Sequence, residues 1–294
     1  MGKNKMKQKK INLLPLFFLL PALVLIIFVF IYPLIRIISD SFLTLKSGEH
    51  VFVGLLNYKN IFLVDTKFQT ALRNNGILLL GVPVLVFLAL VTSSIIFEKI
   101  KGWQFFRTIF FMPYVLAITV VSVVFSFLYR LDGIINFIFG KLGLNFLQLD
   151  WLGDVKIVIF SILLVIIWHE FGFGMILFLA RLMSIDKELY EAAIIDGANW
   201  WQRLFHITIP QLRTIIEFYT VICIINLLSW SFNYIYSMTA GGPGNASYIL
   251  EFYIYKTAFS YSAPNYAAAL SVLLFVAVFL LITIQQFLRL RQSD

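Results

Sequence analysis

Long runs of apolar residues, separated by short polar segments, dominate the chain. A helix that crosses a bilayer needs about 20 mostly apolar residues, and six runs reach or approach that length. They cover residues 13–35, 76–97, 108–129, 157–180, 218–236 and 266–288. The pattern predicts an all-α polytopic membrane protein with six transmembrane helices.

The composition supports this interpretation and excludes other classes of protein. The 294 residues are 61% hydrophobic and 13% charged, whereas soluble domains are about 45–50% apolar and about 25% charged. A soluble enzyme, a nucleic-acid-binding domain and a disordered chain are therefore excluded, and no nucleic-acid partner is expected. Cys223 is the one cysteine and there are three histidines, so neither an internal disulfide nor a metal site is expected.

The distribution of Lys and Arg predicts the orientation. With the N-terminus inside, the inner segments hold 14 of the 23 Lys and Arg residues, and the longer outer segments hold 8. This bias favours both termini in the cytoplasm. The expected organisation is a cytoplasmic basic tail at 1–12, a first transmembrane helix at 13–38, an outer loop with an amphipathic segment at 39–75, and a core at 76–290. The apolar run after the basic tail is too long for a cleaved signal peptide, so we expect it to stay as a span.

The segment between the fourth and fifth spans, residues 184–212, predicts two short helices joined at a glycine. Asp186 is expected to cap the first helix, and Gly197 is placed to end it in a left-handed conformation. Asn199 and Gln202 offer a second cap, and Pro210 is expected to limit the second helix. We expect an apolar group to bury against the span ends, made up of Trp200, Trp201, Leu204 and Phe205.

The tip of this segment is polar and carries small side chains. Ala192, Ala193 and Ala198 give it little bulk, and Glu188, Glu191 and Asp196 give it acidic groups suited to a basic partner. The alternative is an amphipathic helix that touches only lipid headgroups, but such helices favour Lys and Arg on their polar face. The acidic tip, the two caps and the glycine favour docking to a protein.

EAAIIDGANWWQRLFHITIP, residues 191–210, resembles the EAA loop of permease subunits of binding-protein-dependent ABC importers. The matching residues are Glu191, Ala192, Ala193, Asp196, Gly197, Ala198 and Pro210. MTAGGPGNAS, residues 238–247, and the aromatic segment after it resemble the sugar-type branch, which includes permeases for maltose, other oligosaccharides and glycerol phosphate. Asp186 departs from the pattern, because that branch often has proline there.

The resemblance implies the type I importer permease core (MetI-like) and a set of partners. A second homologous permease completes the pore, two copies of a cytoplasmic ABC ATPase receive the EAA loops, and an extracytoplasmic solute-binding protein delivers a sugar. The implied location is the inner membrane of a prokaryote. The coupling residues would be Glu188, Glu191, Ala192, Ala193, Asp196, Gly197 and Ala198.

The sequence agrees with the assignment of ATP binding to a partner subunit. No G-x-x-x-x-G-K-[ST] motif occurs in the sequence, so the chain lacks the loop that cradles ATP phosphates. We therefore expect no catalytic residues and no cofactor bound by this chain, with ATP and Mg²⁺ bound by the partner ATPase. The chain is expected to be a transport subunit and not an enzyme.

Polar residues inside the spans suggest where a solute would pass, because such residues usually face the bundle interior. The fourth span contains Trp168, His169 and Glu170, followed by two glycines that let a neighbour approach. In the fifth span, helical spacing places polar and aromatic residues on one face: Asn226, Ser229, Trp230, Asn233 and, nearby, Tyr234. The alternative is hydrogen bonding between packed helices, and a structural or gating role is slightly favoured for His169 and Glu170.

Three other functions compete with a sugar importer. An importer of the same type could carry glycerol phosphate or another polar solute. A stand-alone carrier driven by an ion gradient would need several acidic groups in the membrane, and Glu170 is the only acid within the spans. A membrane-embedded enzyme would need a cluster of His or carboxylate side chains, and the sequence suggests none.

Overall fold

The computed structural model describes residues 14–46 and 48–291 of the chain. Helices make up most of this part, as the apolar pattern predicted. The expected basic tail at residues 1–12 and the first residue of the expected first span lie outside the described residues.

Five helical segments in the described part of the chain are long and apolar enough to cross a membrane. They are Phe18–Asp40, Thr66–Phe97, Val158–Leu182, Trp200–Ser229 and Pro264–Phe287. A sixth candidate is the pair Trp103–Val115 and Ile118–Leu128, which bends by 98° at a short break. The expected six spans are therefore present when the bent pair counts as one.

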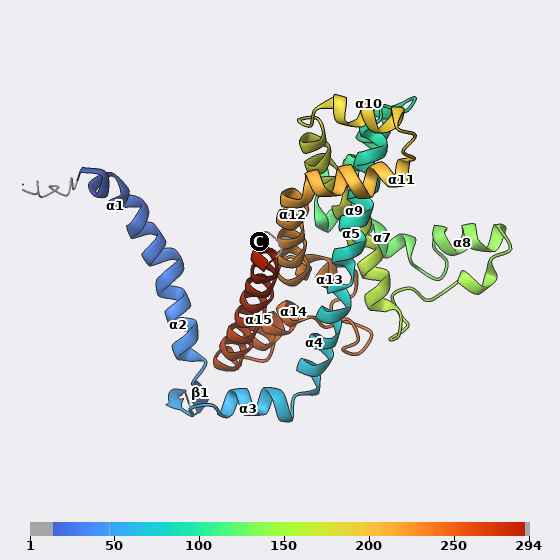
Figure 1. Cartoon of the computed structure of the whole chain (residues 1–294). Coiled ribbons are helices and arrows are strands. Elements are labelled where there is room, and N and C mark those ends of the chain that lie inside the picture. Colours follow the sequence, from blue (N-terminus) through green and yellow to red (C-terminus); the bar gives the residue numbers. More distant parts are fainter. Residues whose placement is uncertain (1–13, 47, 292–294) are drawn as a thin grey trace, which may run out of the picture.

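Figure 1 labels the helices that form these spans, except α6. They are α1 (Leu14–Ile26), α2 (Tyr32–Asp40), α4 (Thr66–Leu79), α5 (Gly81–Phe97), α6 (Trp103–Val115), α7 (Ile118–Leu128), α9 (Val158–Leu182), α11 (Trp200–Arg203), α12 (Ile209–Ser229) and α15 (Pro264–Arg291). The π-helical segments η1 (Ile27–Ile31) and η3 (Leu204–Thr208) join α1 to α2 and α11 to α12.

The first span stands apart from the other helices (Figure 1). No residue in its most apolar window is buried within the chain, and it meets the bundle where α2 contacts α15. Its exposed side chains are almost all apolar. This helix is therefore suited to an apolar surrounding on nearly every side.

The segment after the first span is more ordered than an outer loop. β1 (Leu43–Lys46) and β2 (Glu49–Phe52) form an antiparallel hairpin, a small exception to the all-α expectation. In α3 (Leu56–Leu63), the Asn57 amide donates to the Ser41 and Leu43 carbonyls, each at 2.8 Å. Asp65 then caps α4, so the second span begins before the predicted residue 76.

α9 lies at the centre of the core, with α5 and α6 packed on it. Ile162, Val165 and Phe178 of α9 are fully buried. A Cβ at Gly172 would collide with the Phe110 carbonyl of α6, and one at Gly174 would collide with the Tyr219 ring of α12. The expectation that these glycines admit neighbouring helices is confirmed.

The third span is not the straight helix predicted over 108–129. It begins earlier, at Trp103, and breaks where Leu116 and Ala117 take extended conformations. Pro113 has no N–H to donate and weakens the helix just before the break. The Leu116 carbonyl accepts a hydrogen bond from His169 of α9, at 3.1 Å. A contact with a distant helix therefore stabilises a break that the apolar pattern does not reveal.

Shorter elements complete the chain. They are α8 (Ile134–Lys141), η2 (Asn145–Leu147), α10 (Lys187–Ile195), α13 (Phe232–Met238), α14 (Leu250–Tyr255) and η4 (Lys256–Ser260). α13 packs against α7, and α14 packs against α15 and α4. The buried Asn74 amide donates to the Ala246 and Tyr248 carbonyls, at 2.6 and 2.8 Å, and fixes the glycine-rich turn before α14.

Candidate functional site

α10 and α11 meet at Gly197 to form an elbow, defined here as residues 187–203, at one end of the bundle (Figure 1). Gly197 has φ +82°, a left-handed conformation that glycine adopts without steric cost. Its N–H donates to the Ile194 carbonyl at 3.0 Å, and the Ala198 N–H donates to the Ala193 carbonyl at 2.9 Å. These two bonds form a Schellman motif, so the predicted helix end at Gly197 is confirmed.

The second half of the elbow begins with the predicted cap. The Asn199 side chain accepts from the Gln202 N–H at 2.9 Å, and the Gln202 side chain accepts from the Asn199 N–H at 2.7 Å. This reciprocal capping box satisfies two backbone donors at the start of α11. Together with the Schellman motif, it fixes the direction of both helices with local hydrogen bonds.

Two details of the predicted elbow are wrong. The Asp186 side chain makes no capping bond at the start of α10. Pro210 does not limit the second helix, because α11 continues through η3 into α12 as one helical segment from Trp200 to Ser229. The π-helical turn of η3 precedes Pro210, which stands in the first turn of α12, where its missing N–H is tolerated.

The apolar group of residues 200, 201, 204 and 205 does not bury as expected. Leu204 is buried and Trp200 is half-buried, but Trp201 and Phe205 are exposed. The rings of Trp201 and Phe205 stack with their centroids 6.2 Å apart.

The tip of the elbow is open to a partner. Its acidic residues, Glu188, Glu191 and Asp196, are all exposed. None of the ion pairs found within residues 14–46 and 48–291 includes them. Ala192 is also exposed, whereas Ala193 and Ala198 are half-buried. The structure thus brings the seven predicted coupling residues together on one short element with unpaired carboxylates.

Contacts that the sequence did not predict attach the elbow to the bundle. The Tyr190 hydroxyl lies 3.0 Å from the Thr208 hydroxyl, and the Tyr190 and Phe97 rings are 5.1 Å apart. Burial raises the pKa of Tyr190 above its ordinary value, so its hydroxyl stays protonated at neutral pH. Arg203 donates to the Ala198 carbonyl at 2.8 Å and to the Glu98 carboxylate at 2.6 Å.

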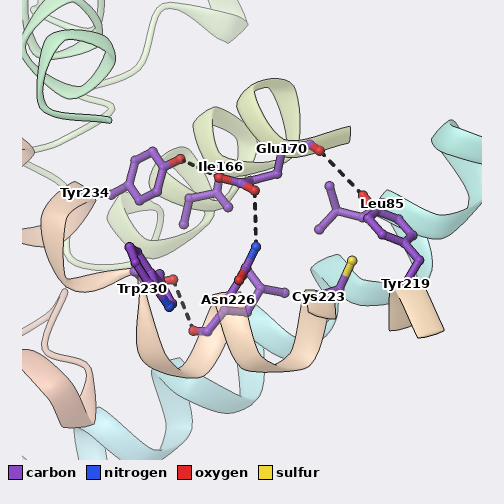
Figure 2. Close-up of a pocket in the computed structure, with 10 residues that line it drawn as sticks. Leu85, Ile166, Glu170, Tyr219, Cys223, Asn226, Trp230 and Tyr234 are labelled. Carbon is purple, nitrogen blue, oxygen red and sulfur yellow. Dashed lines mark hydrogen bonds between the residues drawn. The ribbon is translucent and has the colours of Figure 1, made fainter. Parts of the chain in front are cut away.

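A second polar site lies inside the bundle, where Glu170 of α9 points between Tyr234 and Asn226 (Figure 2). The Tyr234 hydroxyl donates to Glu170 Oε1 at 3.2 Å, and the Asn226 amide donates to Oε2 at 3.4 Å. His169 Nδ1 lies 3.1 Å from Glu170 Oε1 and 2.7 Å from the Tyr234 hydroxyl. Four residues from three helices therefore share one hydrogen-bond network.

His169 connects this network to the break in the third span. Its Nε2 lies 3.1 Å from the Leu116 carbonyl oxygen. Because a carbonyl can only accept, Nε2 must carry a hydrogen. Nδ1 then faces Glu170 and Tyr234, so the two sides of one buried ring bind the broken helix and the carboxylate. This arrangement fits the structural or gating role favoured for the pair.

The cavity beside this network is small. It measures about 10 Å³ and is lined by Glu170, Asn226, Trp230, Tyr234 and neighbouring apolar and polar side chains. A volume of about 10–15 Å³ holds roughly one water molecule. A sugar does not fit this cavity in the conformation described.

The other predicted pathway residues are not all in this network. Trp168 points elsewhere and packs on the Phe125 ring of α7, with centroids 5.1 Å apart. Ser229 and Trp230 are exposed, and Asn233 is half-buried.

The expectation of one continuous helical face from Asn226 to Asn233 is wrong, because α12 ends at Ser229 and α13 starts at Phe232. The Ser231 hydroxyl donates to the Leu227 carbonyl and replaces a backbone bond at this break.

Sequence reasoning missed several residues of the site. Tyr219 and Cys223 line the cavity, and their spacing of four and three residues from each other and from Asn226 is the signal of a shared helical face. The Tyr219 hydroxyl donates to the Glu170 carbonyl at 3.5 Å. No local signal marks Leu116, because its role depends on the fold.

Comparison with known families identifies the chain. The family model described as "Binding-protein-dependent transport system inner membrane component" matches residues 11–292. The chain belongs to this family. The resemblance suggested by residues 191–210 is therefore confirmed, and the chain is an ABC transporter permease of the inner-membrane type with the fold expected of it.

Similar permeases occur in several organisms. The probable ABC transporter permease protein YurN of Bacillus subtilis (strain 168) is 35% identical over 274 residues, which are 90% of this chain and 92% of YurN. The probable ABC transporter permease protein PH1215 of Pyrococcus horikoshii is 37% identical and covers 87% of this chain and 89% of its own. The lactose transport system permease protein LacF of Rhizobium radiobacter is 33% identical, with 89% of each chain covered.

A solved structure has the same fold. It is the crystal structure of a bacterial ABC transporter involved in the import of the acidic polysaccharide alginate. One of its chains matches with a TM-score of 0.79 and 24% identity, covering 96% of this chain and 96% of that chain. This likeness supports the arrangement of helices in the permease fold.

Proposed function

We propose that this permease is the pore-forming subunit of an ATP-driven importer, that it moves a mono- or oligosaccharide by alternating access, and that the elbow couples it to a separate ATPase. The observation that carries the proposal is the elbow itself. Its two helices are fixed by a Schellman motif and a capping box, and its exposed tip carries three acidic side chains. Acidic groups on a rigid element suit a basic protein surface.

The proposal includes the partners that a transporter of this family would need. A second homologous permease completes the pore, two copies of a cytoplasmic ABC ATPase bind the elbows, and an extracytoplasmic binding protein delivers the solute. The ATPase holds ATP and Mg²⁺, and this chain holds no cofactor. The elbow and both termini face the cytoplasm in this arrangement, in agreement with the distribution of Lys and Arg.

Transport in this proposal follows from the attachment of the elbow. ATP binding draws the two ATPase subunits together, and each elbow moves with them. Because α11 continues into α12 as one helix, movement of the elbow turns the helix that carries Asn226. ATP favours the outward-facing state only through its higher affinity for that state, and hydrolysis returns the pore to the inward-facing state.

Sugar is proposed as the cargo on two grounds. Among the relatives, LacF belongs to a lactose transport system, and AraP of Halalkalibacterium halodurans, 29% identical, belongs to an arabinooligosaccharides transport system. In this chain, Glu170 and Asn226 offer groups that bond hydroxyls, and the exposed Trp230 ring offers a flat apolar face. Sites that combine aromatic faces with a few polar groups are typical of small-molecule binding.

The coupling proposal is tested by replacing residues 188–198 with a Gly/Ser linker. The transporter is purified in detergent from cells that express its permeases and ATPase. The ATPase should co-purify with the wild-type chain and be lost from the linker variant. A matched control replaces residues 143–147, a short partly exposed segment after α8, with a Gly/Ser linker and should retain the ATPase. Co-purification with the elbow variant would contradict the proposal.

The cargo is tested separately. A thermal-shift screen of the binding protein against sugars and glycerol phosphate should give the largest stabilisation with a sugar. Uptake of that sugar into vesicles should require the ATPase and ATP. Uptake by this chain alone, driven by an ion gradient, would instead identify a secondary carrier.

A further inference from the structure

Side-chain packing does not brace the joint of the elbow, which is the turn at Gly197. A Cβ at Gly197 would meet no atom within 4 Å, so the conformation there rests on hydrogen bonds and not on side chains packed against the glycine. A cavity of about 540 Å³ lies between α10 and the ends of α5, α6 and α9, lined among others by Phe97, Tyr190 and Ile194. Because α10 borders an open space, force applied at its tip is resisted by the hydrogen bonds of the joint and by the contacts between the elbow and the bundle.

The Arg203 side chain lines this cavity and bonds the backbone at the joint. Arg203 Nη1 donates to the carbonyl of Ala198, the residue directly after Gly197, at 2.8 Å. Its Nη2 donates to Glu98 Oε1 at 2.6 Å. The two side chains are 14% and 36% exposed, so solvent screens this ion pair less than a fully exposed one. A single guanidinium thus holds both the backbone of the joint and a carboxylate of another helix.

Glu98 stands where the second span ends. It is the C-cap of α5, and Lys99 after it has φ +52°, which turns the chain sharply towards α6. α5 in turn packs along α9, the central helix of the core. A displacement of Arg203 should therefore move α5 and, through its packing, α9, the helix that carries His169 and Glu170.

We propose that Arg203 and Glu98 are positioning residues for coupling: their ion pair makes the elbow and the α5–α9 pair move as one body. The inference rests on the proposed function of the elbow and adds the path by which its motion enters the bundle. In this proposal, neither side chain binds solute or nucleotide. They act by preventing rotation at Gly197 while force is applied at the tip.

The chemistry of arginine is essential in this arrangement. The planar guanidinium presents donors in a fixed fork, so it can bond the Ala198 carbonyl and the Glu98 carboxylate at once. Lysine keeps the positive charge but offers a single point donor on a flexible stem. Arg203→Lys should therefore leave the charge of the elbow unchanged and release one of its two contacts.

The test measures whether the elbow and the far end of the bundle move together. In a Cys223→Ser background, spin labels are placed at two exposed positions, Leu189 of α10 and Val64 at the end of α3. These two helices lie at opposite ends of the molecule (Figure 1). Distances between the labels are measured by pulsed EPR in the assembled transporter, without nucleotide and after trapping with ATP and vanadate. In the otherwise unchanged chain, the distance should be the same in both states.

Glu98→Gln and Arg203→Lys should each shift or broaden the trapped distance by about 2 Å or more, the scale of helix shifts in switching proteins. The exchanged pair, Glu98→Arg with Arg203→Glu, should restore a narrow, unchanged distance. A matched control is Asp132→Asn, which breaks the exposed Arg130–Asp132 pair at 2.9 Å and should have no effect.

Distances that stay unchanged in Glu98→Gln and Arg203→Lys would overturn the inference. So would loss of the ATPase from these two variants, because the pair would then act in docking or folding. Failure of the proposed function is distinguishable from both results, since the wild-type permeases would then not retain the ATPase and uptake would not depend on ATP.

Discussion

Glu170 in α9 and Glu191 in α10 are carboxylates on helices of the same chain, and their surroundings are opposite. Glu170 is mostly buried and is bonded by Tyr234, Asn226 and its neighbour His169. Glu191 is exposed beside an open cavity. A buried charge needs partners within the chain, whereas an exposed charge is free to receive them from another protein. Glu170 is thus placed to hold the bundle together, whereas Glu191 is placed to connect the bundle to another protein.

The largest effect is expected at the joint between these regions. Gly197→Pro should reduce ATP-dependent uptake by about a hundredfold, within the usual range of coupling energies between sites, because proline cannot adopt the φ of +82° found there. Uptake is measured in vesicles, and membrane insertion is followed by the yield of folded chain. Gly197→Ala is the matched control, since its Cβ has open space and costs only the backbone strain. Equal uptake in Gly197→Pro and wild type would contradict the role of the elbow.

The buried carboxylate should matter for stability. Glu170→Ala leaves the Tyr234 hydroxyl and the Asn226 amide without this acceptor, so we expect a loss of about 2 kcal/mol in the free energy of unfolding. Thermal unfolding of the purified transporter measures it. Glu170→Gln keeps an acceptor oxygen and should lose less. If both variants unfold like the wild type, the network does not stabilise the bundle.

The exposed carboxylate should show the reverse pattern. Glu191→Lys should leave thermal stability within about 0.5 kcal/mol, as is usual for surface substitutions. Affinity for the ATPase should fall by about tenfold, because a like charge is then placed against a basic surface. Binding is measured with purified ATPase, and Glu49→Lys, at an exposed position in β2, serves as control. A Glu191→Lys variant that binds normally would place the docking contact elsewhere.

A third carboxylate, Glu251 of α14, should affect stability only as the pH changes. Its Oε2 accepts from the Phe232 N–H at 3.0 Å. Burial raises its pKa to about 7, although the bonds from Phe232 and Ser231 act in the opposite direction. The folded chain therefore holds a proton that the unfolded chain releases above about pH 4.5. Stability from this group should fall as pH rises from about 4.5 to 7, by about 3 kcal/mol for the full difference in pKa.

Glu251→Gln cannot titrate and should remove this pH dependence. The measurement is the melting temperature of the purified transporter at several pH values in that window. Identical pH profiles for Glu251→Gln and wild type would show that Glu251 is already ionised in the folded chain.

Local signals explain why the spans and the elbow could be predicted from sequence. Twenty apolar residues, a glycine at a helix end and a reciprocal Asn199–Gln202 cap each depend on neighbouring positions. The break at Leu116 and the Glu98–Arg203 pair depend on partners 53 and 105 residues away. No pattern within a short window contains that information.

Burial was harder to predict for a different reason. In a soluble protein, apolar side chains such as Trp201 and Phe205 indicate the core, because water covers the outside. In a membrane, both the core and the surroundings are apolar, so the side chain does not reveal its direction. Glu170 and Asn226 were more informative, because polar groups in a span face inward and both meet in the same network.

The helical segment from Trp200 to Ser229 joins the elbow to the polar network around Glu170. A small tilt at its first turn therefore displaces its other end by a larger distance. Its 30 residues span about 45 Å at 1.5 Å per residue. A tilt of ~10° about its first turn would sweep its far end through about 8 Å on that length. The bond between Asn226 and Glu170 is 3.4 Å long, so a modest angular change at one end is enough to pull the polar network apart at the other.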